Sequence, residues 1–260
     1  MSFTSWGHLV FAVTMIMLGI LGLVKGDFPP TWSGVPEALP AREVVAYFCA
    51  FASLVSGIGL LWGRARLLAA RFLLVYLMAW LLLVRVSHIL AAPTSQDAWW
   101  AAGDTAVMAA ATWMLYASFT ADRGASSPRF ATGERGVRIA RVLYGLALIP
   151  FGVAHFTYLK ETVALVPGWL PAHTAWAYLT GGAFLAAGVA VLIGVGARLA
   201  ATLSALQMGL FTLVVWVPVV LAGPTPFQWS EFIDSWALTA GAWVVADSYR
   251  GVPWLAAGRR

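Results

Sequence analysis

Charged residues are scarce in this 260-residue chain: Asp, Glu, Lys and Arg together make up 10% of it, against roughly 25% in an average soluble domain. Hydrophobic residues make up 61% of the sequence. A chain of this composition cannot cover its surface with polar groups. The sequence therefore predicts an integral membrane protein whose first partner is the lipid bilayer.

Cysteine occurs only once, at Cys49. This excludes a disulfide within the chain and a membrane thiol oxidoreductase that works through paired cysteines. The patterns CxxC and HExxH, the phosphate loop and the dinucleotide fingerprint are missing too, so we predict no metal site. The net charge of +5 comes from arginines scattered over short loops, which does not indicate nucleic-acid binding.

Apolar stretches long enough to cross a bilayer, at about 20 residues each, recur along the whole chain. They predict an all-α polytopic membrane protein with eight transmembrane helices, at residues 6–25, 43–62, 68–92, 98–118, 138–157, 173–193, 198–222 and 229–247. The first stretch has no basic residue before it and no small-residue cleavage site after it, so it is expected to be a retained helix rather than a signal peptide.

An internal repeat relates the two halves of the chain at an offset of about 131 residues. Matching residues include Val35-Pro36 with Val166-Pro167, Gly57 with Gly188, Asp104 with Asp234 and Trp113 with Trp243. One structural unit is therefore used twice. Gly57, Gly181, Gly182 and Gly188 are predicted to let neighbouring helices approach closely.

The repeat predicts three regions: a first four-helix repeat at 1–120, a linker rich in Gly, Ser and charge at 121–137, and a second repeat at 138–260. Four spans per unit is an even number, so both units enter the membrane from the same side, as parallel repeats.

The basic residues predict which side that is. Lys25, Arg42 and Lys160 fall on one side of the predicted spans, Arg85 lies within a span, and the other Lys and Arg fall on the side of the termini. By the positive-inside rule, both termini are cytoplasmic. The expected location is a cell membrane, with a bacterial inner membrane favoured.

Ionisable groups inside the spans mark sites worth testing, because they are costly in lipid. Arg85 on the third span and Asp104 on the fourth have opposite charge and similar predicted depth. We expect them to form a structural ion pair. Two alternatives stay open: a functional polar site in the outer leaflet, and an Arg85 that reaches the membrane surface alone.

A second candidate site lies near the outer face of the second half. His155 stands at the outer end of the fifth span, and Glu231 and Asp234 share one face of the eighth. Such a group could bind a ligand's polar head, with aromatic residues flanking its apolar part: Trp169, Tyr178 and Trp229. The alternative is that these residues only anchor helix ends at the water boundary. No catalytic residue is predicted.

The second half resembles the DoxX-like family of small four-helix membrane proteins over residues 138–247. The resemblance rests on a Gly-x-x-His-Phe run, a Val-Pro-x-Trp-Leu-Pro turn and a later Thr-Gly and Gly, here Gly152, His155, Phe156, Val166 to Pro171, Thr180, Gly181 and Gly188. The first half resembles the family only through the repeat, because it lacks the His-Phe pair. A tandem duplication of the family's unit would explain both observations.

The resemblance implies two classes of function. One is a quinone- or redox-linked membrane subunit, with quinone as its cofactor and another redox subunit as partner. The other is a non-enzymatic protein for lipophilic-ligand binding, transport or membrane assembly. The sequence does not decide whether the protein is an enzyme, because fold analogy does not fix chemistry.

Overall fold

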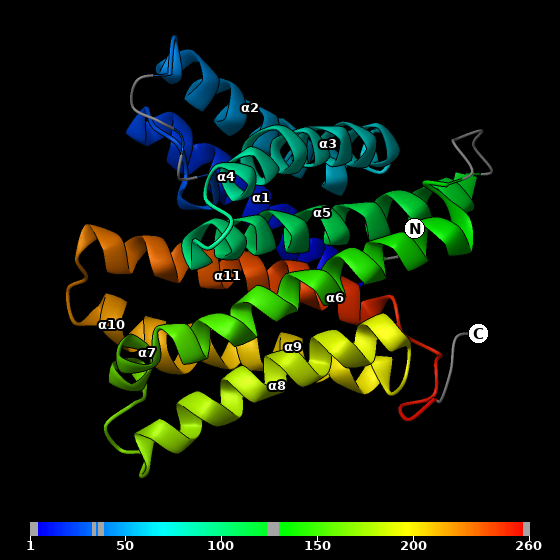
Figure 1. Ribbon diagram of the computed structural model, residues 1–260. Coiled ribbons are helices and arrows are strands. Elements are labelled where there is room, and N and C mark those ends of the chain that lie inside the picture. Colours follow the sequence, from blue (N-terminus) through cyan, green and yellow to red (C-terminus); the bar gives the residue numbers. More distant parts are fainter. Residues whose placement is uncertain (1–4, 33–34, 36–38, 124–129, 257–260) are drawn as a thin grey trace.

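The computed structural model describes residues 5–32, 35, 39–123 and 130–256, and all regular structure within them is helical (Figure 1). The elements are α1 (Trp6–Lys25), η1 (Pro30–Trp32), α2 (Arg42–Leu61), α3 (Arg66–Trp80), η2 (Leu81–Arg85), α4 (Val86–Ala91), α5 (Gln96–Arg123), α6 (Gly133–Thr157), α7 (Leu159–Leu165), α8 (His173–Ile193), α9 (Ala197–Leu210), η3 (Phe211–Trp216), α10 (Val217–Leu221) and α11 (Pro226–Asp247). Element η1 is a 3₁₀ turn, whereas η2 and η3 are π-helical.

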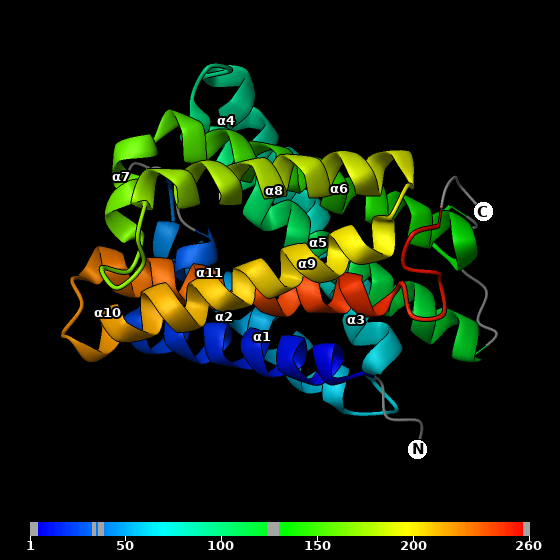
Figure 2. The same cartoon turned by 90° about the horizontal axis from the view of Figure 1, so that it is seen from below.

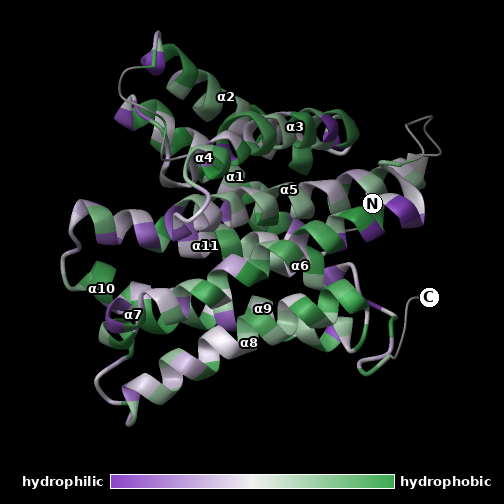
Figure 3. Cartoon of the chain, viewed as in Figure 1, coloured by the Kyte–Doolittle hydropathy of each residue, from purple (hydrophilic) through white to green (hydrophobic). Residues whose placement is uncertain are grey.

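Six of these helical segments are long and apolar enough to cross a membrane: α1, α2, Arg66–Ala91, α6, α8 and Ala197–Leu221. The third segment is one continuous helical segment made of α3, η2 and α4, and the last is made of α9, η3 and α10. Figure 3 shows hydrophobic residues along the outward-facing helices and hydrophilic residues at several of their ends. Among the described residues, the prediction of an all-helical chain with several helices suited to cross a membrane is confirmed, whereas eight spans and the repeat arrangement stay predictions.

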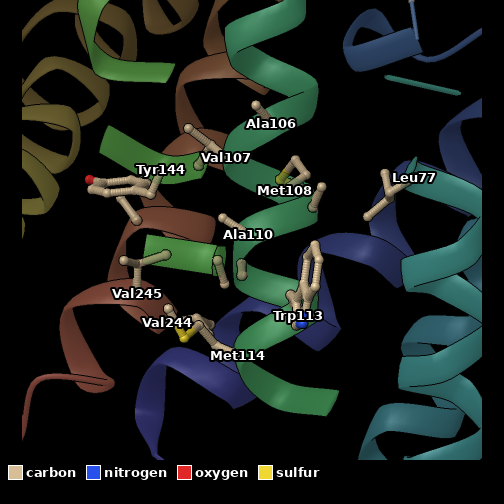
Figure 4. Close-up of a cluster of buried hydrophobic side chains, with 14 of the residues drawn as sticks. Leu77, Ala106, Val107, Met108, Ala110, Trp113, Met114, Tyr144, Val244 and Val245 are labelled. Atoms are coloured by element: carbon tan, nitrogen blue, oxygen red, sulfur yellow. The ribbon is translucent and has the colours of Figure 1, made fainter. Parts of the chain in front are cut away.

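Helices α5 and α11 stand apart from those six because their composition is more polar. Both are long enough to span, at 28 and 22 residues, but each carries an aspartate in its first half, at Asp104 and Asp234. Helix α5 lies at the centre of the bundle and is buried over residues 102–117, whereas α11 is only partly covered. Figure 4 shows α5 with Tyr144 of α6 and Val244 and Val245 of α11 on one side and Leu77 of α3 on the other. The burial of α5 explains why it tolerates a less hydrophobic sequence.

Packing between helices follows the same order in each half. In the first half α1 packs on α2, α2 on α3 and α3 on α5; in the second, α6 packs on α8, α8 on α9 and α9 on α11. Helices α5 and α11 then pack on each other. The start of α1 and the end of α11 lie at the same end of the bundle, because a Cβ on Gly7 would lie 2.8 Å from Asp247 Oδ2.

Glycines set the closest helix contacts, and they do so in matching pairs. A Cβ at Gly57 would lie 2.7 Å from the carbonyl oxygen of Ala12, and one at Gly188 would lie 2.9 Å from that of Gly145. The prediction that these glycines allow close approach is confirmed for Gly57 and Gly188. Gly181 also packs tightly, because an added Cβ would lie 2.7 Å from the Cβ of His155. A Cβ added at Gly182 would have no neighbour within 4 Å.

The π-helical segments also fall at matching positions. An offset of 131 residues carries Leu81–Arg85 onto positions 212–216, which lie within η3. A π-helical turn is rare and often occurs at a functional site, because it widens the helix and redirects side chains. In η3 it brings Thr212 Oγ1 within 2.7 Å of Ser235 Oγ and 3.0 Å of Thr239 Oγ1 on α11.

Capping residues explain where two of the long helices start. The side chain of Ser5 accepts a hydrogen bond from the backbone of His8 at the start of α1. At the start of α11, Thr225 and Gln228 form a capping box and Pro226 occupies the first turn. The predicted linker at 121–137 overlaps α5 and α6 at its two ends, and residues 124–129 lie outside the described part of the chain.

Candidate functional site

His155 lies in the interior of the second half, among aromatic rings. Its imidazole stacks on Phe211 at 5.9 Å between ring centroids and meets Phe184 edge-on at 5.5 Å. Its Nδ1 donates a hydrogen bond to the carbonyl oxygen of Phe151, 2.8 Å away and one turn earlier on α6. The ring is therefore held by packing and by its own helix.

Glu231 and Asp234 lie on α11. The charges in electrostatic range of Asp234 include Asp104, Glu231 and Arg85. The structure thus brings the two predicted acidic residues together. His155 contacts Phe151, Phe184 and Phe211, and its place in one site with the acidic pair stays a prediction.

The three predicted aromatic residues lie on or next to α8 and α11. Trp169 is exposed in the connection between α7 and α8. Tyr178 is half exposed on α8, with its ring 5.8 Å from that of Phe156. Trp229 packs against Phe232 on its own helix at 5.6 Å. Their role beside the acidic pair stays a prediction.

Arg85 is almost completely buried, at 2% exposure, at the end of η2. Its Nε donates to Thr105 Oγ1 at 3.1 Å, and its Nη2 donates to the carbonyl oxygen of Thr31 at 3.1 Å. Asp104 lies one residue before Thr105 and within electrostatic range of the guanidinium. Neither of these two hydrogen bonds goes to Asp104, so the Arg85–Asp104 ion pair stays a prediction.

The turn η1 packs against this polar region. Trp32 has no exposed surface and packs at 5.2 Å from the ring of Tyr76 and 5.7 Å from that of Trp80. Because η1 also contacts α5 and α11, it enters the bundle and carries Trp32 into the interior.

A groove of about 580 Å³ opens on another face of the molecule. Helix α9 with η3 forms one wall, α11 forms the floor, and Val10 of α1 forms part of the opposite wall. Figure 2 shows α11 between α9 and α1. The walls are mainly apolar: Ala205, Leu206, Gly209, Leu210, Leu213, Trp236 and Trp243.

One end of the groove carries charge. Arg198, Asp247 and Arg250 line it, together with Trp254. Arg198 lies 4.0 Å from the centre of the Trp254 ring and donates to the carbonyl oxygen of Val252 at 2.7 Å. Arg250 pairs with Asp247 at 2.7 Å. The C-terminal segment thus holds two guanidinium groups at the end of an apolar channel.

Sequence reasoning missed this groove because its residues carry no motif. Arg198 and Arg250 were interpreted only as topology signals, and Trp236 and Trp243 are ordinary residues for a membrane helix. One signal in the sequence could have indicated the groove: Arg198 and Arg250 have the same predicted depth. Only the packing of α1 away from α9 shows that an open channel lies beside them.

No protein-family model, no curated protein and no solved structure matches this chain. The fold and the geometry described above therefore define the protein only by class: it is a helical protein with several segments that are long and apolar enough to cross a membrane.

Proposed function

We propose that this chain is an integral membrane protein with eight spans, built from two parallel DoxX-like repeats, with both termini in the cytoplasm. Three observations support the arrangement: the matched order of helix packing, the matched glycine contacts of Gly57 and Gly188, and the matched π-helical segments. Helices α5 and α11 would then be the two spans that lie nearest the repeat axis.

We further propose that the protein is a non-enzymatic lipid-binding protein that holds an anionic phospholipid in the groove between α1, α9 and α11. The observation that carries this proposal is the groove itself, with its apolar walls and charged end. Its volume of about 580 Å³ lies within the range of roughly 300–1,000 Å³ that is usual for ligand sites.

The charges favour an anionic phospholipid over a neutral one. Arg198 and Arg250 contribute two positive charges and Asp247 one negative charge, so that end of the groove has a positive balance. Arginine binds phosphate well, because its planar guanidinium offers several donors in a fixed geometry. In the proposed topology this end faces the cytoplasmic leaflet, where anionic lipids attract basic residues.

The quinone- or redox-linked function stays a prediction that rests on the sequence resemblance. Its expected site joins His155 to Glu231 and Asp234, and no contact between the imidazole and either carboxyl group supports it among the described residues. The aromatic rings around His155 leave its imidazole 6% exposed.

The experiment that tests lipid binding is native mass spectrometry of the protein released from nanodiscs that contain phosphatidylglycerol and phosphatidylcholine. We expect the wild-type protein to retain phosphatidylglycerol. The double variant Arg198→Gln/Arg250→Gln should lose that preference. Arg138→Gln removes an exposed charge near the start of α6 and is the matched control. This variant should keep the preference for phosphatidylglycerol. Equal retention of both lipids by the wild type would contradict the proposal.

A further inference from the structure

The carboxyl groups of Asp104 and Asp234 occupy matching positions on the two central helices. Asp104 follows the start of α5 by eight residues, and Asp234 follows the start of α11 by the same number. Helices α5 and α11 pack on each other, and the two carboxylates lie within electrostatic range. The repeat therefore places one carboxyl group from each half at the contact between the halves.

Both carboxyl groups have an oxygen without a partner. Asp104 is buried, at 8% exposure, and its Oδ1 is closed off from solvent and accepts no hydrogen bond. Asp234 is half-buried, but its Oδ1 is also closed off and unpartnered. A buried carboxylate oxygen with no donor is costly, because it has lost its water and gained nothing in return.

The charged groups around this pair do not balance it. Among the residues that the structure describes, Arg85 from η2 and Glu231 from α11 lie within electrostatic range of the pair. Three carboxylates and one guanidinium leave a net negative charge around two carboxylate oxygens that solvent does not reach. The hydrogen bonds of Arg85 to Thr105 and Thr31 do not supply the missing donors.

We propose that Asp104 and Asp234 bind one proton between them, as a carboxyl–carboxylate pair that joins the two halves. A protonated carboxyl group is a donor, so one proton supplies the hydrogen bond that an unpartnered oxygen lacks and removes one of the opposed charges. Like charges held close together favour such sharing, because both groups cannot ionise without strong repulsion. The site is independent of the groove, which lies beside α9 and shares neither residue with it.

The proton has a structural consequence. If the shared proton is lost, Asp104 and Asp234 both carry a negative charge at the contact between α5 and α11, where water screens the buried oxygens poorly. The contact between the two halves is therefore expected to loosen when the proton leaves. The contact between α5 and α11 therefore depends on the shared proton, independently of any lipid in the groove.

Infrared spectroscopy of the full-length protein in lipid bilayers tests this proposal. A protonated buried carboxyl group gives a C=O stretching band that is separate from the carboxylate bands and shifts in D₂O. We expect the wild-type protein to show this band at about pH 7, where an ordinary aspartate is ionised. Absence of the band from the wild type at that pH would overturn the proposal without any variant.

Variants then assign the band. Asp104→Asn and Asp234→Asn should each remove it, because each leaves a single carboxylate that no longer shares a proton. Glu161→Gln, at an exposed position on α7, is the control and should leave it unchanged. A band that survives in both Asn variants, or that disappears only in Glu231→Gln, would place the proton elsewhere and overturn the assignment.

A sodium titration of the melting temperature separates a proton from a metal cation at the same pair. We expect sodium and choline chloride to give the same melting temperature at equal ionic strength. A rise with sodium alone that Asp104→Asn abolishes would identify a cation site and contradict the proposal.

Discussion

Trp113 and Trp243 occupy matching positions on α5 and α11, but their surroundings differ. Trp113 is 8% exposed, and its Nε1 donates to the carbonyl oxygen of Ala131 at 3.0 Å. Trp243 is 39% exposed and lines the groove. The segment before α6 closes over the first tryptophan, whereas no described segment closes over the second. The two halves therefore differ at the groove, where Trp243 is exposed and its counterpart Trp113 is covered.

Filling the groove should displace its lipid. Ala205 lines the groove on α9, so Ala205→Trp places a large ring where an acyl chain would lie. We expect at least a several-fold loss of retained phosphatidylglycerol in native mass spectra. Leu203→Trp, on the exposed face of the same helix and outside the groove, is the matched control and should retain the wild-type amount. Equal retention by the two variants would argue against the groove as the binding site.

Adding one methyl group at Gly57 should destabilise the bundle. The new Cβ would lie 2.7 Å from backbone atoms of both Ala12 and Ile16, and overpacking of this kind costs about 1–3 kcal/mol. Gly188→Ala should also destabilise the bundle: the flexible end of Ile149 at 2.8 Å can move, but the carbonyl oxygen of Gly145 lies at 2.9 Å. Thermal unfolding in detergent measures both changes.

Gly182→Ala is the control for this series. Nothing lies within 4 Å of a Cβ at Gly182, and alanine favours a helix over glycine by about 1 kcal/mol. The melting temperature should stay the same or rise slightly. If Gly57→Ala and Gly182→Ala have the same melting temperature, the close contact between α1 and α2 does not exist.

The Asp27–Arg42 ion pair should make a small, pH-dependent contribution to stability. Partial burial raises the pKa of Asp27, but hydrogen bonds from the backbone of Phe28 and from Arg42 outweigh this effect and hold the pKa below its ordinary value. The stabilisation is therefore present above the unfolded pKa of about 3.9 and is lost as pH falls through the folded pKa. Both side chains are partly exposed, so the effect is modest.

The measurement is the difference in melting temperature between wild type and Asp27→Asn. This difference should be positive at about pH 7 and should shrink as the pH falls through the folded pKa, which lies below about 3.9, because the carboxyl group then becomes protonated in the wild type as well. Glu161→Gln serves as a control, because Glu161 forms no ion pair within the described residues. A wild-type advantage that grows on acidification would contradict the sign of this prediction.

Single cysteines should report the proposed topology. Cys49 is fully buried and can be replaced by alanine to give a background without thiols. Thr94→Cys, exposed between α4 and α5, should react with an impermeant maleimide added to intact cells. Glu134→Cys, exposed at the start of α6, should react only after the membrane is opened. Labelling of both positions from outside would rule out an arrangement with cytoplasmic termini.

Hydropathy placed the long helices well, because the need to cover a bilayer dictates where apolar residues can occur. The predicted spans 6–25 and 173–193 coincide with α1 and α8. The fourth and eighth predicted spans, at 98–118 and 229–247, lie within α5 and α11. Their aspartates and their central position make these two the least apolar of the set.

The candidate sites were harder to predict, because a sequence gives the depth of a residue in a helix but not the direction in which the helix turns it. His155 was grouped with Asp234 by depth, yet it packs on Phe184 and Phe211. Trp32 is buried because the turn η1 carries it into the interior, and no local sequence pattern indicates this. The groove depends on the spacing between α1 and α9, which no local pattern encodes.

Photocrosslinking of lipid to the wild-type protein tests the central claim most directly. Phosphatidylglycerol with a photoactivatable acyl chain would be incorporated into nanodiscs with the protein, irradiated, and the modified peptides mapped by mass spectrometry. The account predicts that modification concentrates on residues 198–213 and 236–254, which hold nearly all of the groove residues, and that it falls sharply in Ala205→Trp. Modification spread evenly over the lipid-facing sides of α2 and α8, and unchanged in Ala205→Trp, would contradict the claim.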